Sequence, residues 1–350
     1  MEEDSFPKVE SVTKIEEGIP YNFDYITFYE YLDDTFLLCT ARNLLMLYYF
    51  TEEEKTLELF NTINLGQIII SVLIYDKEYF FILVEHTLVI YKIELLEEET
   101  FKKINEIKIN ENFRAIFELN NNNFLLLYDG GVIILEYFKA DNKIQIRGKY
   151  RYLNEEDMGM YPYQCYAFGI NSKKNKFKNK INDIILFRYE KISFVNYTTF
   201  KTTKTLLDQR CEIPFDYKAK QLVIDNSKNL IGFNSNGHYF FIVDMYKKEI
   251  PYKFIYPGTL YYQIFSMEQL DNNKYICSYN ERGCYSSNFS ISFCNIFGDE
   301  FYKDMFKFQR RDIISEDKNI ICTTINSTKN FIFCQPFKKA GLYLIHLDYS

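Results

Sequence analysis

The feature that most constrains the fold of this chain is a pattern that returns about every 45 residues. In each copy an apolar strand ends, a short turn of Asp, Asn, Ser or Lys follows, and a second strand opens on an apolar, usually aromatic, residue. The openings are Phe36, Tyr79, Phe124, Ile184, Leu230, Tyr275 and Phe331, separated by 43, 45, 60, 46, 45 and 56 residues. A spacing near 45 residues is what four short strands per repeat require.

The turns and the two long spacings have physical explanations in the sequence. Asp and Asn recur in the turns because their short side chains bond to nearby backbone and accept left-handed conformations. Polar residues 154–160 and the Lys-rich stretch 171–180 lengthen one spacing, and the polar stretch 280–288 lengthens the other. Surface loops tolerate such insertions, so the seven repeats remain equivalent.

A third strand follows the second one in every repeat. These strands are nearly continuous apolar runs, namely Leu44–Tyr48, Leu88–Ile93, Val132–Leu135, Ile192–Val195, Tyr239–Val243, Ile291–Cys294 and Leu342–Leu347. Such runs are typical of strands covered on both faces. The connectors Asp129-Gly130-Gly131 and Asn236-Gly237 are typical of tight hairpins. A more charged fourth strand follows in most repeats, as expected for a half-exposed edge.

The two ends of the sequence complement each other. The chain stops at Ser350 directly after the seventh third strand, and the strand-like segment Val9–Ile15 precedes the first repeat. We therefore predict an all-β fold: a seven-bladed β-propeller of four-stranded antiparallel blades, closed by an N-terminal strand, as one domain over residues 1–350. The alternative is a helical array. It is supported only at Phe301–Arg311, where apolar residues recur at helical spacing.

These features resemble the WD40 family of seven-bladed β-propellers. The resemblance covers nearly the whole chain and rests on the seven repeats, the closing strand, and a third strand that ends in Asp at Phe241-Ile242-Val243-Asp244. The family's Trp-Asp dipeptide cannot occur because the chain has no Trp, and Gly237-His238, the single Gly-His, precedes a third strand instead of opening a repeat. Aromatic packing by Phe and Tyr is expected in its place. The resemblance implies a rigid scaffold for protein complexes.

Composition indicates in which cellular compartment the protein works and which partners it does not attract. A net charge of -7 argues against attraction of nucleic acid over the whole surface. The start Met1-Glu2-Glu3-Asp4 has no features of a secretory signal, and the longest apolar stretches, such as Ile68–Tyr75, are far shorter than the roughly 20 residues that span a bilayer. Eight Cys without a CxxC pair favour free thiols in a reducing compartment. We expect a cytoplasmic protein that does not span a membrane, with the nucleus left open.

Catalytic motifs are missing from the sequence. The three histidines, His86, His238 and His346, lie more than 100 residues apart, and there is no HExxH, GxSxG, P-loop or GxGxxG motif. We therefore predict a non-catalytic protein with no cofactor and no metal site. A propeller enzyme whose channel metal is held by scattered carboxylates or Asn stays an alternative.

Charged loops are the candidate binding residues. Five lysines of one insertion form a candidate site for phosphate groups of lipid or RNA, or else a solvated loop: Lys173, Lys174, Lys176, Lys178 and Lys180. Arg310 and Arg311 resemble the Arg-Arg motif of phosphoinositide-binding propellers, without its following Gly. Opposite charge is found in two third-to-fourth-strand connections, at Glu52, Glu53 and Glu54 and at Glu97, Glu98 and Glu99.

These loops lead to two predictions of function. If the ring is correct, the acidic connections and the Lys loop open on the same face, which then has an acidic and a basic half suited to docking a protein. The leading prediction is a protein-interaction scaffold, as a subunit of a larger complex. The alternative is a propeller that makes weak contact with phosphoinositide or RNA through its Lys-rich loop.

Overall fold

The computed structural model describes residues 8–15, 19, 23–31, 34–95, 100–151, 166–170, 181–188, 191–207, 223–225, 230–235, 239–255, 261–271, 274–282, 287–295, 322–327, 330–336 and 342–348. Apart from the short 3-10 helix η1 (Lys139–Asp141), all elements in these ranges are β-strands, which confirms the all-β prediction. The chain divides into two compact units, residues 1–64, 237–240 and 252–350, and residues 65–236 and 241–251. A single domain over residues 1–350 stays a prediction.

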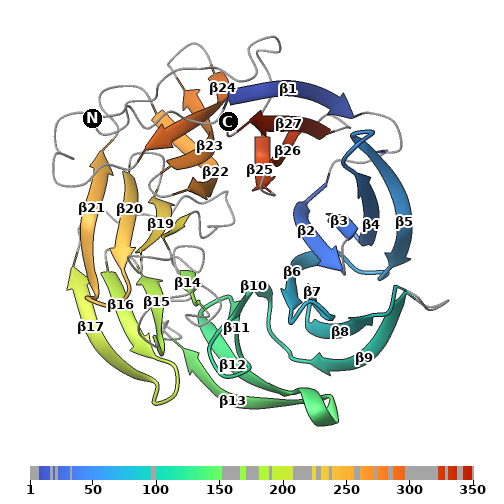
Figure 1. The fold of residues 1–350 in the computed structure, drawn as a ribbon. Helices are drawn as coiled ribbons and strands as arrows, with labels where there is room; N and C mark the ends of the chain where they lie inside the picture. The colour runs from blue at the N-terminus through green and yellow to red at the C-terminus, as the bar shows by residue number, and fades with distance from the viewer. Residues whose placement is uncertain are drawn as a thin grey trace. The chain divides into compact units, whose positions relative to one another are not determined.

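Unit 1 contains three antiparallel sheets (Figure 1). The β2–β5 sheet consists of β2 (Tyr25–Tyr31), β3 (Asp34–Ala41), β4 (Leu44–Thr51) and β5 (Thr56–Asn64). The closing sheet has the order β1 (Lys8–Ile15), β27 (Leu342–Asp348), β26 (Phe331–Pro336) and β25 (Cys322–Ser327). The third sheet has the described strands β22 (Tyr261–Asp271), β23 (Lys274–Arg282) and β24 (Ser287–Asn295).

Unit 2 contains three complete sheets, and the remaining sheet of the chain is given after them. The first two are β6 (Ile69–Tyr75), β7 (Tyr79–Val84), β8 (Thr87–Ile93) and β9 (Phe101–Lys108), then β10 (Phe113–Glu118), β11 (Asn123–Tyr128), β12 (Gly131–Phe138) and β13 (Lys143–Arg151). The third is β14 (Tyr166–Phe168), β15 (Asp183–Arg188), β16 (Lys191–Asn196) and β17 (Lys201–Leu207). The fourth is β18 (Val223–Asp225), β19 (Leu230–Ser235), β20 (Tyr239–Asp244) and β21 (Glu249–Ile255).

The predicted strand pattern is confirmed in each of these sheets. All seven opening residues lie at or near the start of the second strand, and all seven predicted third strands are present. Every residue of β7 is buried, whereas β9 and β13 alternate between exposed and half-buried positions. Left-handed backbone occurs in the expected turns, at Asp76, Asn121 and Asn122 with φ of 53°, 58° and 56°, and at Gly130 with φ of 86°.

The closing strand is also confirmed. β1 pairs antiparallel with β27, from Val9 opposite Leu347 to Ile15 opposite Leu342, and Figure 1 shows the two strands side by side. The two ends of the chain therefore share one sheet, which removes an open edge from β27. A ring of seven blades stays a prediction, and the possible helix at residues 301–311 lies outside the described residues.

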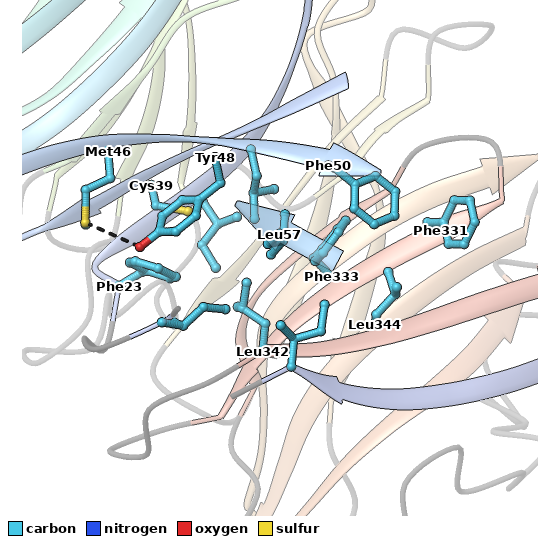
Figure 2. Packing of buried hydrophobic residues seen from close by; sticks show 14 of the residues in the cluster. Phe23, Cys39, Met46, Tyr48, Phe50, Leu57, Phe331, Phe333, Leu342 and Leu344 are labelled. Carbon is cyan, nitrogen blue, oxygen red and sulfur yellow. Dashed lines mark hydrogen bonds between the residues drawn. The ribbon is translucent and has the colours of Figure 1, made fainter. Parts of the chain in front are cut away.

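Aromatic side chains fill the joints between neighbouring sheets, as the absence of Trp led us to expect. In unit 1, Phe50 of β4 meets Phe331 and Phe333 of β26 edge to face, with ring centroids 5.3 and 5.1 Å apart (Figure 2). In unit 2, Phe81 of β7 stacks on Phe124 of β11 with centroids 4.5 Å apart. Aromatic pairs of this kind add to the free energy of burial, so they hold adjacent sheets together.

Candidate functional surface

The structure describes three of the predicted binding residues. Glu52, Glu53 and Glu54 lie exposed in the turn between β4 and β5. The other predicted residues lie outside the described ranges: Glu97, Glu98, Glu99, Lys173, Lys174, Lys176, Lys178, Lys180, Arg310 and Arg311. A face with an acidic and a basic half therefore stays a prediction.

The two histidines that the structure describes both have partners within the protein: His86 contacts the connection between β9 and β10, and His346 contacts strands of its own sheet. The Nδ1 atom of His86 lies 2.8 Å from the carbonyl oxygen of Glu111. His346 of β27 stacks on Phe331, with ring centroids 4.6 Å apart, and its Nδ1 atom pairs with the carboxylate of Glu10 on β1. Within the described ranges, no three His, Cys, Asp or Glu side chains converge as a metal site would require. No helix among the same residues is long and apolar enough to cross a membrane.

The outer strand of a sheet is the edge strand that pairs only with the third strand of the repeat. Besides β21, there are five for which the structure gives the register, namely β5, β9, β13, β17 and, in the closing sheet, β1. In each of these five strands the register shifts once, because one extra residue bulges out of the ladder. The extra residues are Glu10, Phe60, Ile104, Arg147 and Thr203. A bulge twists an edge away from flat pairing, so it hinders the addition of a foreign strand.

The residue directly before the outer strand is left-handed in four sheets. Lys55, Asn142, Phe200 and Lys248 have φ between 51° and 57°, and each is followed at once by β5, β13, β17 or β21. A left-handed residue at this point turns the chain sharply into the outer strand.

Each of these left-handed residues contacts the outer strand of the preceding sheet at or beside the bulge. Lys55 Nζ donates to Ser11 Oγ at 3.1 Å, and Asn105 Nδ2 donates to the carbonyl oxygen of Asn142. The Phe200 ring covers Gly148 so closely that a Cβ atom there would lie 2.4 Å from ring carbons. The repeated contact locks neighbouring sheets together at their outer edges.

At Lys248, the fourth of these left-handed residues, the contact with the preceding sheet includes an ion pair. Lys248 Nζ lies 2.9 Å from Asp183 Oδ2 and donates to Thr203 Oγ1 at 2.7 Å. Thr203 Oγ1 in turn donates to Asp183 Oδ1 at 2.9 Å. The Asp183 side chain is mostly buried, so its charge is held by these polar partners instead of by water.

Three consecutive outer strands of unit 2 differ from the others in their charge. We call β9, β13 and β17 the basic outer strands, because nine of their 24 residues are Lys or Arg and only Glu106 is acidic. In the whole chain, Lys and Arg make up 41 of 350 residues and are outnumbered by 48 acidic residues. In unit 1, β1 and β5 together carry two Lys and two Glu. Positive charge in unit 2 is therefore concentrated on these three outer strands.

Some of these cations already bind carboxylates of the protein itself. Lys103 Nζ lies 2.7 Å from Glu106 Oε2, Arg147 pairs with Glu136, and Lys149 pairs with Glu111. The Lys149 ammonium group also lies 4.8 Å from the centre of the Tyr128 ring. Five others are exposed and form no ion pair with any carboxylate that the structure describes: Lys102, Lys108, Lys143, Lys201 and Lys204.

The sequence pattern did not predict this surface. Successive basic outer strands begin about 40 residues or more apart in the chain. In the sequence, the apolar positions of β9 and β13 predicted half-exposed outer strands, and their charges were not compared. The signal was nevertheless present in the sequence, because β9, β13 and β17 together carry nine Lys or Arg and one acidic residue, whereas β1 and β5 together carry two Lys and two Glu.

Comparison with known proteins gives a fold. No protein-family model and no curated protein sequence matches this chain. Three crystal structures are similar: Saccharomyces cerevisiae Sqt1 (TM-score 0.56, 8% identity, covering 95% of this chain and 98% of that one), a chain of the mitotic checkpoint complex (0.61, 9%, 98% and 93%), and the C-terminal WD40 domain of Sif2 (0.58, 10%, 97% and 99%). The chain therefore has a WD40-like β-propeller fold.

Proposed function

We propose that this chain is a non-catalytic scaffold that binds other proteins within a larger assembly. The fold supports this proposal, because similar structures include a chain of a multi-protein complex, the mitotic checkpoint complex. Fold alone does not determine function, so the proposed function also has to agree with the residues of the candidate surface.

The observation that carries the proposal is the contrast between inner and outer strands. The inner strands are buried and joined by aromatic packing, as at Phe81 and Phe124, and the outer strands are locked to their neighbours at Ser11, Asn105 and Gly148. The side chains on the exposed surface of the outer strands, in contrast, differ in charge from one sheet to the next. A rigid frame that presents different surface chemistry on successive sheets is suited to binding partner proteins.

The test is affinity purification of the tagged full-length chain under native conditions, followed by mass spectrometry and size-exclusion chromatography. We expect a reproducible set of proteins that co-elute with the chain at a size larger than its own 42.1 kDa. Elution of the chain alone, in the presence of its source lysate, would contradict the scaffold proposal. Reconstitution from purified components then separates direct partners from indirect ones.

Binding of phosphoinositide or RNA through Lys173, Lys174, Lys176, Lys178 and Lys180 stays a prediction, because these residues lie outside the described ranges. A cytoplasmic or nuclear location also stays a prediction. Cys39 is buried and free, and burial raises the pKa of its thiol well above the usual value.

A further inference from the structure

We propose that the basic outer strands bind an acidic segment of a partner protein. The inference rests on the proposed scaffold function and deepens it, because it names the surface and the chemistry of the partner. The proposal depends on the positions of the cations on β9, β13 and β17 and on the carboxylates that they bind.

The charge is not explained by protection of sheet edges. Lysines on an edge strand are a common defence against strand addition, and so are bulges. All five outer strands described above have a bulge, and among them β5 carries no Lys or Arg. Because β5 has a bulge and needs no lysine beside it, the nine cations of β9, β13 and β17 call for a second explanation.

The three strands form one continuous stretch of surface. Asn105 of β9 donates a hydrogen bond to the carbonyl oxygen of Asn142, the residue that leads into β13. Gly148 of β13 is covered by Phe200, the residue that leads into β17. These two contacts hold each basic strand against the start of the next one, so a single bound segment can reach cations on all three.

The surface already binds carboxylates within the protein. Glu106, Glu111 and Glu136 each pair with a cation of β9 or β13. The exposed lysines that form no ion pair with a described carboxylate are distributed over all three strands, with Lys108 on β9, Lys143 on β13 and Lys204 on β17 among them. A segment rich in Asp and Glu would give these lysines the partners that the described residues do not supply.

Two other polyanions fit the surface less well. Single-stranded RNA is bound by aromatic side chains that stack on bases, but Phe101 of β9 is buried and Tyr150 of β13 is half-buried. An anionic bilayer requires several exposed apolar groups beside the cations, and on β13 only Ile146, 47% exposed, has that property. The whole chain also carries a net charge of -7, which opposes approach to an extended anionic plane. A short acidic segment responds mainly to the local positive charge.

The experiment compares two triple variants of the full-length chain with equal change in charge. The test variant is Lys108→Gln, Lys143→Gln and Lys204→Gln, with one exposed lysine from each basic outer strand. The control variant replaces exposed lysines outside these strands: Lys8→Gln, Lys14→Gln and Lys247→Gln. Circular dichroism and thermal melting verify that both variants fold as the wild type does.

Fluorescence anisotropy measures binding of three labelled probes: a short peptide of Asp, Glu and Leu, a single-stranded RNA oligonucleotide, and vesicles of phosphatidylcholine with phosphatidylserine. We expect the peptide to bind best, with an affinity that decreases as salt increases. The test variant should weaken peptide binding by about tenfold, since three favourable charge contacts are lost, while the control variant stays within about twofold of the wild type.

Four results would overturn the inference: no peptide binding by the wild type, equal loss in both variants, tighter binding of RNA or vesicles than of peptide, or a concentration-dependent dimer of the chain that the test variant abolishes. The last result would assign the surface to a second copy of the chain. If partners co-purify with the wild type while the peptide fails to bind, the inference fails and the scaffold proposal stands. If no partner co-purifies, it is the scaffold proposal that fails.

Discussion

The joint between sheets is built differently in the two units, although it uses the same position of the repeat. Phe50 of β4 and Tyr137 of β12 both lie two residues beyond the point at which the third strand meets the bulge of the outer strand. Phe50 contacts Phe331 and Phe333 and forms part of an apolar cluster (Figure 2). Tyr137 packs edge to face on aromatic rings too, but its hydroxyl group donates to Asn142 Oδ1 at 2.8 Å.

The difference shows which properties of the repeat are fixed and which are free to vary. Both side chains are almost completely buried, so the repeat requires a large ring at this position to fill the space between sheets. Whether the ring carries a hydroxyl group depends on the neighbouring turn, where Asn142 is left-handed and can accept the bond. Geometry is thus shared between repeats, while polarity is set locally.

Removing the ring of the apolar joint should have the largest effect on stability. Phe50→Ala leaves a cavity between β4 and β26, and we expect the free energy of unfolding to decrease by about 3 to 5 kcal/mol. Urea denaturation followed by circular dichroism measures the change. The matched variant Phe50→Tyr tests the comparison itself, because a hydroxyl group placed there has no equivalent of Asn142 and should also destabilise the protein. A loss below about 1 kcal/mol for Phe50→Ala would show that the joint is not tightly packed.

The polar joint should make stability sensitive to alkali. Burial, together with the neighbouring Tyr79 and Tyr75, raises the pKa of Tyr137 from 10.0 to about 12. The unfolded chain loses this proton near pH 10 and the folded chain only near pH 12, so the stabilisation is complete below pH 10 and disappears as the pH rises through 12. We expect a contribution of about 1.4 kcal/mol for each pH unit in that window.

The measurement compares wild type with Tyr137→Phe by urea denaturation between neutral pH and pH 12. At neutral pH the variant should be less stable, since its bond to Asn142 is lost, and its disadvantage should shrink or reverse as the wild type loses stability at high pH. Parallel curves for the two proteins across this range would show that Tyr137 does not titrate with a raised pKa.

The outer contact between sheets should have the smallest effect of the three. Gly148→Ala forces the Phe200 ring away from β13, and because a ring at the end of a side chain can move, we expect a loss of about 1 to 2 kcal/mol. A double-mutant cycle with Phe200→Ala is the check, since the second substitution should cost little once the first has displaced the ring. Additive losses would mean that the two residues do not act through their contact.

Much of this fold could be predicted from the sequence, because each strand leaves a local signal. Apolar runs such as Val132–Leu135 predicted buried strands, and Asp and Asn in turns predicted left-handed backbone, which is found at Asp76 and Asn121. The closing strand at Val9–Ile15 was predicted from an unpaired third strand at the other end of the chain. The bulges were not predicted, since a single extra residue in an outer strand does not change the apolar pattern visibly.

The candidate surface was less accessible to sequence analysis. The charged loops drew attention because their residues are consecutive, as in Glu52, Glu53 and Glu54, whereas the cations of the basic outer strands are interleaved with apolar residues such as Ile144 and Ile146. Alternation along a strand sends neighbouring residues to opposite faces, so charge that gathers on a surface is dispersed in the sequence.

The strands, their turns and their repetition follow from the amino-acid sequence alone, because hydrophobic alternation and turn chemistry act between residues that are close along the chain. Only the tertiary structure decided which residues meet between sheets: Lys55 with Ser11, Phe200 with Gly148, and the succession of β9, β13 and β17 as one basic surface. Those contacts depend on the register of each ladder and on the left-handed residue before each outer strand. Both are fixed by the packing of whole sheets against one another.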